Sequence, residues 1–215
     1  FELKKPKQEF IIVPKGPALF PLRNNNKFLF LGFLNSKVTK YFLDIFSDRH
    51  DYQNIDIKRL PFIEVNSNIK EKIDNIVSKN VEISKMDWDS FETSWDFIKH
   101  PILIYKQNVR TIKQAFNNWS AFVEKQFHQL KFNEEELNRI FIDIYGLQDE
   151  LTPEEDDKDV TIRKADRVRD IKSFISYTVG CMFGRYSIDA DGLIYAGGEW
   201  KNKWTIDNGH GQLGT

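Results

Sequence analysis

The segment from Phe174 to Trp200 holds five of the eleven glycines of the chain and its single cysteine. A dinucleotide-binding loop requires G-x-G-x-x-G between a strand and a helix, so that backbone amides reach the pyrophosphate. Gly180 and Gly184 have instead the spacing G-x-x-x-G within a predicted helix, which lets another element approach the backbone closely. Asp191-Gly192 then gives a hairpin turn signal. We interpret the segment as a closely packed helix and a hairpin near residues 187–197, without a cofactor.

The other reactive side chains form no convincing catalytic or metal site. The four histidines are scattered along the sequence, and one cysteine cannot build a zinc cluster. They are His50, His100, His128 and His210. Cys181 is expected on a buried helix face, where a thiol is usually inert. Asp189 and Asp191 lack the remaining ligands of a calcium loop. We therefore predict no catalytic, cofactor-binding or metal-binding residue.

The formal net charge is −1, but the charges are unevenly distributed along the sequence. Residues 1–60 carry a net charge of +5, residues 61–160 carry −8, and residues 161–215 carry +2. A basic segment followed by an acidic one suggests a polyanionic partner for the first part of the chain only.

The cations of residues 1–60 alternate with side chains that can read nucleic-acid bases. Lysine and arginine attract phosphates, while asparagine, glutamine and arginine can hydrogen-bond to base edges in the major groove. The predicted DNA-contact residues are Lys15, Arg23, Asn35, Lys37, Arg49, Tyr52, Lys58 and Arg59. An ordinary solvated face would have the same residue types, so composition alone leaves both interpretations open.

The composition as a whole is that of a globular protein. Apolar residues make up 40% and charged residues 29% of the 215 positions, a typical globular balance. Apolar runs such as Phe28–Leu34 are far shorter than the ~20 residues of a membrane span. A lone cysteine fits a reducing compartment, so we expect a cytoplasmic protein. The chain begins with Phe1 in mid-pattern, and we expect it to be part of a longer protein.

Residues 1–65 are expected to combine short strands with one helix. Glu9–Val13 is a β-rich run, and the prolines and glycine of Pro14–Leu22 disfavour a helix. Apolar side chains at helical spacing predict a helix over residues 28–46. A polar link and a short strand that ends at Pro61 would complete this first domain.

Residues 66–215 are expected to be a helical region. One long helix is predicted over residues 108–131. Asn133 has the form of an N-cap that starts another helix, with Gly146 near its C-terminal end.

A last helix is predicted over residues 162–186. Its expected buried side chains are Val168, Ile171, Phe174, Ile175, Val179, Met182 and Phe183. The predicted fold class is therefore α+β but mainly α, with a small β-containing piece at the N-terminus.

Two stretches resemble a known family. Phe28–Phe62 resembles the end of a target recognition domain in DNA methyltransferases and restriction-modification proteins, where a helix carrying LNSK precedes a DIKxLP-like strand. Phe132–Trp200 closely resembles the C-terminal half of the adenine-specific DNA methyltransferases of BREX phage-defence systems (PglX type). Ser94–Leu103 matches the same region of that family.

The resemblance implies N6-adenine methylation of host DNA with S-adenosylmethionine as the methyl donor. The Asn/Asp-Pro-Pro-Tyr/Phe motif of such enzymes, which positions the flipped adenine, is absent from these 215 residues. We therefore expect the catalytic domain upstream and an inactive segment here. Residues 1–65 would complete the recognition domain and contact double-stranded DNA, and residues 66–215 would form a helical support.

Two alternatives remain at this point. The segment could be a protein-interaction scaffold that docks other phage-defence proteins, because the acidic residues 61–160 would repel phosphate. It could also belong to the specificity region of a restriction enzyme whose nuclease lies elsewhere. We assign no Asp…Glu-x-Lys cluster of a nuclease in the sequence.

Overall fold

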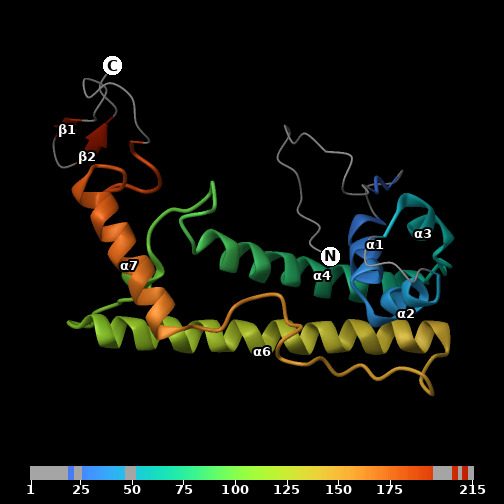
Figure 1. Cartoon of the computed structure of the whole chain (residues 1–215). Coiled ribbons are helices and arrows are strands. Elements are labelled where there is room, and N and C mark those ends of the chain that lie inside the picture. Colours follow the sequence, from blue (N-terminus) through green and yellow to red (C-terminus); the bar gives the residue numbers. More distant parts are fainter. Residues whose placement is uncertain (1–18, 22–25, 47–51, 196–204, 208–209, 213–215) are drawn as a thin grey trace. The chain divides into compact units, whose positions relative to one another are not determined.

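The computed structural model describes residues 19–21, 26–46, 52–195, 205–207 and 210–212 (Figure 1). The described chain is mainly helical and divides into two compact units. Unit 1 comprises Phe1–Val81 and Leu130–Asp159, and unit 2 comprises Glu82–Gln129 and Val160–Thr215. Both units are therefore assembled from segments that are distant in the sequence.

The helix predicted over residues 28–46 is in fact two helices, α1 (Lys27–Leu34) and α2 (Lys37–Phe46). Asn35 is the C-cap of α1, and its side chain donates to the carbonyl of Leu31 at 2.9 Å. Ser36 directly precedes α2, and its hydroxyl accepts from the backbone of Thr39 at 3.4 Å while donating to Phe33 at 2.7 Å. The break arises because asparagine and serine satisfy helix ends better than helix interiors.

The core of unit 1 packs α1 and α2 against α4 (Ser67–Asp89) and the second half of α6 (Ile112–Tyr145). Phe33, Val38, Ile73 and Phe141 are among its buried members. Gly32 permits the close approach of α1 and α4, because a Cβ atom there would lie 2.9 Å from a methyl group of Val77.

The prediction of a short strand before Pro61 is wrong, because residues Asn54–Arg59 form helix α3. Gln53 and Asp56 form a capping box, in which the Asp56 carboxylate accepts from the backbone of Gln53 at 2.9 Å. This local hydrogen bonding favours helix over strand. The strands expected before residue 19 lie outside the described residues, and the described part of residues 1–65 contains no strand.

The two helices expected on either side of Asn133 are one continuous helix, α6, which contains neither proline nor glycine. Asn133 is buried inside it and donates to the side chain of Asn80 on α4 at 2.7 Å. Its amide therefore joins two helices and does not cap one. The predicted end at Gly146 is confirmed, since this glycine has φ +65° and directly follows Tyr145.

Unit 2 contains residues 82–89 of α4, the first half of α6, the short α5 (Pro101–Ile104) and α7 (Arg167–Met182). Its aromatic cluster consists of Phe97, Tyr177 and Tyr186. The Tyr177 and Tyr186 rings stack at a centroid distance of 5.2 Å. None of the helices in the described parts of the chain has the length and apolar character of a membrane span.

Helix α7 is shorter than predicted at both ends. It begins after Asp166, whose carboxylate accepts from the backbone of Arg169 at 2.6 Å. It ends before Gly184, which has φ +74° and is therefore not inside the helix. The predicted close approach at Gly180 is confirmed, because a Cβ atom there would lie 2.7 Å from the Tyr186 ring.

The hairpin expected near residues 187–197 is not seen in its described part, since residues 187–195 contain no strand. The antiparallel strand pair comes later, between β1 (Thr205–Asp207) and β2 (His210–Gln212). Residues 185 and 194 instead form a single backbone hydrogen bond, from Ile194 to Arg185 at 2.8 Å.

The buried face predicted for the last helix is also largely wrong. Tyr177 and Asp170 are the buried residues of α7. The predicted core residues that are exposed are Val168, Ile175, Val179, Met182 and Phe183. Helical periodicity located an apolar stripe correctly but could not show whether this chain covers it.

The close contact at Gly32 generates a stability prediction. We expect Gly32→Val to lower the free energy of unfolding by about 1–3 kcal/mol, because the added methyl groups would collide with Val77 and Ile73. The combined variant Gly32→Val/Val77→Ala should lose less stability than the sum of its single variants.

Urea unfolding measures these differences. Ala121→Val, at an exposed position of α6, controls for a β-branched residue in a helix. Strict additivity of the Gly32 and Val77 variants would contradict the close-packing account.

Candidate DNA-contact surface and adjoining polar network

The structure describes five of the eight predicted DNA-contact residues. Lys15, Arg23 and Arg49 lie outside the described residues. Asn35, Lys37, Tyr52, Lys58 and Arg59 all belong to unit 1, around helices α1, α2 and α3. The structure thus groups the five by unit, but their side chains differ in what they contact.

Lys58 and Arg59 are the most available cations of the set. Both are exposed in the last turn of α3, and neither makes an ion pair with another described residue. The capping box at the start of α3 fixes this short helix. Two adjacent cations on an ordered helix end are a suitable arrangement for contacting phosphate oxygens.

Asn35 and Tyr52 already have partners within the chain. The Asn35 amide group donates to Leu31, as the helix C-cap. The Tyr52 hydroxyl donates to Asp44 at 3.3 Å, and the same carboxylate accepts from Lys40 at 3.1 Å. Burial, followed by the Asp44 charge and hydrogen bond, raises the pKa of the Tyr52 hydroxyl.

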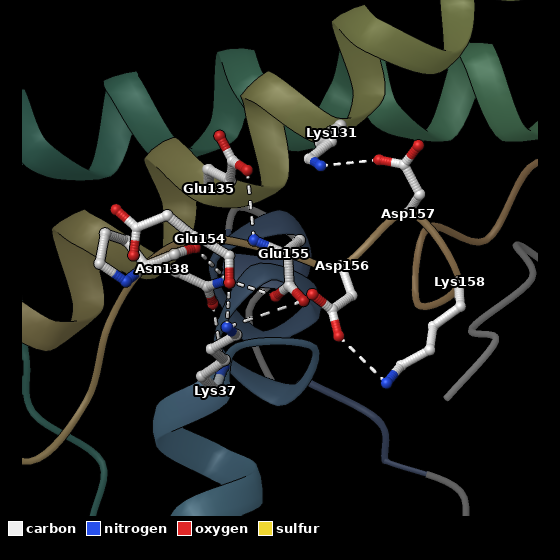
Figure 2. Close-up of polar contacts among 10 residues, drawn as sticks. Lys37, Lys131, Glu135, Asn138, Glu154, Glu155, Asp156, Asp157 and Lys158 are labelled. Carbon is white, nitrogen blue, oxygen red and sulfur yellow. Dashed lines mark hydrogen bonds and ion pairs between the residues drawn. The ribbon is translucent and has the colours of Figure 1, made fainter.

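Lys37 is held by an acidic segment that lies far away in the sequence. Figure 2 shows its side chain pointing toward residues 154–155, where the ammonium donates to the Glu154 carbonyl. The ammonium nitrogen also lies 3.9 Å from Glu155 Oε2. Binding of a DNA phosphate by Lys37 would have to replace these contacts.

Asn138 of α6 is the centre of this polar network (Figure 2). Its Oδ1 accepts from the backbone N–H of Lys37 at 2.9 Å, which satisfies one of the open donors at the start of α2. Its Nδ2 donates to Glu155 Oε1 at 2.6 Å and to the Pro153 carbonyl at 3.3 Å. One buried amide therefore joins α2, α6 and the segment of residues 153–157, which we call the acidic segment.

Further polar contacts fix the acidic segment along α6. The Glu155 backbone donates to Glu135 Oε1 at 3.2 Å, and Lys131 pairs with Asp157 at 2.7 Å. Burial raises the pKa of the nearby Glu134 carboxyl to about 8, and the negative charge of Glu155 acts in the same direction. Glu134 is therefore largely protonated at neutral pH in the folded chain.

His100 and Cys181, among the described titratable residues, have surroundings that explain their pKa shifts. His100 is buried and accepts from the backbone of Ile102 at 3.3 Å, so it caps α5, and burial lowers its pKa to about 4. Burial raises the pKa of the Cys181 thiol, which disfavours the nucleophilic thiolate. Among the residues that the structure describes, no group of three or more His, Cys, Asp or Glu side chains could hold a metal ion.

Gly180 and Gly184, in the described part of the glycine-containing segment, have structural surroundings. The Tyr186 ring occupies the space beside Gly180, and Gly184 serves to end α7. One of these glycines therefore permits close packing, and the other terminates a helix.

One surface was not anticipated as a binding site. The first turns of α6 and α7 line a groove in unit 2, and the exposed apolar stripe of α7 continues from it. The sequence signal was present in the helical spacing of apolar residues 168–183, but that signal is the same for a buried and an exposed stripe.

Comparison with known proteins shows what the chain is similar to. No family model matches the sequence. The chain is similar to one segment of adenine-specific methyltransferases, over most of its own length.

Two relatives carry this similarity. The chain is 45% identical, over 89% of its length, to the adenine-specific methyltransferase PglX of Lacticaseibacillus casei (strain Zhang). It is 29% identical, over 91% of its length, to the adenine-specific methyltransferase BrxX of Escherichia coli O9:H4 (strain HS). It spans about one sixth of these relatives, 16% and 17% of their lengths. The resemblance to PglX-type adenine-specific methyltransferases is therefore confirmed.

The Asn138 contacts lead to a second stability prediction. We expect Asn138→Ala to destabilise the chain by about 1–3 kcal/mol, because the Lys37 amide and the acidic segment lose a buried partner. Chemical unfolding monitored by circular dichroism would measure the change. Asn117→Ala, at an exposed position of the same helix, is the matched control, and equal effects of the two substitutions would contradict a central role for Asn138.

The raised pKa of Glu134 predicts a pH-dependent effect. Between its ordinary value of 4.5 and about 8, the folded state holds a proton that the unfolded state has lost. The contribution of this group to stability therefore falls as pH rises through that window. We expect Glu134→Gln to stabilise the chain by up to about 4 kcal/mol at pH 8 and to have little effect near pH 4.5.

Urea unfolding at several pH values would test this dependence. Glu71→Gln, at an exposed position of α4, should leave the pH profile unchanged. A Glu134→Gln effect of equal size at every pH would show that the carboxyl group is not protonated in the folded chain.

Proposed function

We propose that this chain is a DNA-recognition and support segment of an N6-adenine DNA methyltransferase that marks host DNA in a BREX phage-defence system. The observation that carries the proposal is the 45% identity to PglX over 89% of the chain. In this proposal residues 1–65 complete the target recognition domain, and residues 66–215 hold it in place. This division by role does not follow the compact units, because unit 1 combines residues 1–65 with residues 66–81 and 130–159.

Methyl transfer belongs, in this proposal, to parts of the parent enzyme beyond these residues. The sequence contains no Asn/Asp-Pro-Pro-Tyr/Phe motif, and the spacing of Gly180 and Gly184 is not that of a G-x-G-x-x-G loop. The chain would contribute phosphate contacts and orientation of the duplex, through cations presented on a folded helical unit. The exposed pair Lys58 and Arg59 supports this role most directly.

A second candidate function is protein docking within the same defence system. Two observations favour it: the acidic segment covers Lys37, and α7 exposes an apolar stripe. The acidic segment would repel a DNA phosphate, and the apolar stripe offers a phosphate no favourable contact.

A DNA-binding measurement separates the two functions. We expect the 215-residue chain to bind duplex DNA with an affinity that falls with salt concentration. Lys58→Ala/Arg59→Ala should weaken binding several-fold and reduce the salt slope by about two, one for each lost phosphate contact. Lys79→Ala/Lys125→Ala removes two exposed cations from the acidic middle of the sequence and should have little effect.

The triple variant Lys37→Ala/Arg49→Ala/Lys58→Ala extends the test to the rest of the predicted set. Because Lys37 contacts the acidic segment, the thermal unfolding of the triple variant must be measured together with its DNA affinity. Unchanged affinity in both the double and the triple variant would remove residues 1–65 from the DNA interface and favour the docking function.

A further inference from the structure

The groove between the starts of α6 and α7 lies within unit 2, and none of its lining residues belongs to the predicted DNA-contact set. Its lining residues are Ile112, Lys113, Phe116, Asn117, Arg167, Val168, Ile171 and Lys172. Three of them are cations, four are apolar, and none is a carboxylate. The groove therefore offers positive charge beside an apolar floor.

The three cations of the groove are available for an external partner. Lys113, Arg167 and Lys172 are exposed, and none forms an ion pair with another described residue. The nearest acidic side chains of α7 are already engaged. Asp166 accepts from the backbone of Arg169, and Asp170 is buried and accepts from Arg169 Nε at 2.8 Å.

The apolar floor of the groove continues along α7. Val168, which lines the groove, is 63% exposed, and Ile175 and Val179 are 57% and 43% exposed. Met182 and Phe183 extend the same face at 79% and 72% exposure. These positions recur at intervals of seven, four and three residues, so they form one continuous stripe on the helix. Exposed apolar side chains that are contiguous, and not scattered, mark an interaction surface.

The combination of charge and apolar surface decides the class of partner. Duplex DNA would satisfy the cations but would leave Val168 and Ile175 without apolar contact. A second copy docked by two-fold symmetry would bring the same groove onto itself, and its lining offers no carboxylate to pair with the cations. An amphipathic helix with an apolar face flanked by Asp and Glu satisfies both features, in the helix-in-groove mode of recognition.

The charge of the compact units supports an acidic partner. Unit 1 contains 17 Lys/Arg and 20 Asp/Glu, whereas unit 2 contains 14 and 12. The net charges are therefore −3 and +2. The groove lies in the positive unit, which favours encounter with an acidic segment.

We propose that the groove and the apolar stripe of α7 form a docking surface for an acidic amphipathic helix supplied by another polypeptide segment. This inference goes beyond the proposed DNA recognition and does not depend on it, since it uses different residues in the other unit. Apolar side chains of the bound helix pack on Val168 and Ile175, and its carboxylates pair with Lys113, Arg167 and Lys172.

The test uses the 215-residue chain and a defined probe. The probe is a fluorescent synthetic helix of about 18 residues, with leucines on one face and glutamates on both flanks. Its controls are the same peptide with every glutamate replaced by lysine, and a scrambled peptide of identical composition. Fluorescence anisotropy at several salt concentrations measures the affinity.

Two variants remove the two features of the surface separately. Arg167→Glu/Lys172→Glu reverses the charge, and Val168→Ser/Ile175→Ser removes the apolar contact. Each should weaken binding of the acidic helix by at least about tenfold, with the charge variant also losing the salt dependence. Lys125→Glu and Ile98→Ser, at exposed positions outside the groove, should leave the affinity unchanged.

Several results would overturn the proposal. One is the absence of binding by the acidic helix, and another is equal binding of the lysine or scrambled peptide. Duplex DNA binding that depends on Arg167 and Lys172 but not on Val168 and Ile175 would make the groove a nucleic-acid surface. Self-association abolished by Val168→Ser/Ile175→Ser, measured by analytical ultracentrifugation, would identify a second copy as the occupant. None of these outcomes bears on DNA contact by residues 1–65.

Discussion

The amide side chain of Asn138 determines how the segments of unit 1 come together. It is 2% exposed and bonds to Lys37, which is 101 residues away in the sequence, and to Glu155. A buried amide must satisfy its donors and acceptor, because an unpaired polar group in the interior is costly. This requirement fixes where α2 begins relative to α6 and where the acidic segment lies. The apolar contacts around Phe33 and Phe141 then fill the space that these bonds define.

The acidic segment changes the meaning of the charge pattern along the chain. In sequence, the basic residues 1–60 stand apart from the acidic residues that follow. In the folded chain, residues 130–159 belong to the same unit as residues 1–81 and make that unit net negative. Charges that are distant in sequence thus meet at Lys37 and Glu155. A count along the sequence cannot register such a contact, because attraction depends on distance in space.

Sequence periodicity predicted the helical character of the chain but not its interruptions or its surface. The end at Gly146 followed from a left-handed glycine at a helix end. Sequence could not predict the helix break at Asn35-Ser36 or the continuous helix through Asn133. The same type of residue can cap a helix or bond to a neighbouring helix. Asn133 bonds to Asn80, and only the tertiary contact decides between these uses. The DNA-contact set was predicted from residue types, which could not foresee that Glu154 and Glu155 hold Lys37.

The α7 stripe shows the same limit in energetic terms. Burying an apolar side chain is favourable whether the surface that covers it belongs to the same chain or to a partner. A sequence that exposes Met182 and Phe183 therefore carries the pattern of a core helix, although its core face in unit 2 is built around Tyr177 and Phe97. The helix has two apolar sides: one packs within the unit, and the other continues from a groove lined by Lys113, Arg167 and Lys172. Cations line this groove beside the exposed apolar stripe. They favour contact with a surface that is both apolar and acidic, and this conjunction distinguishes a docking face from an incompletely packed one.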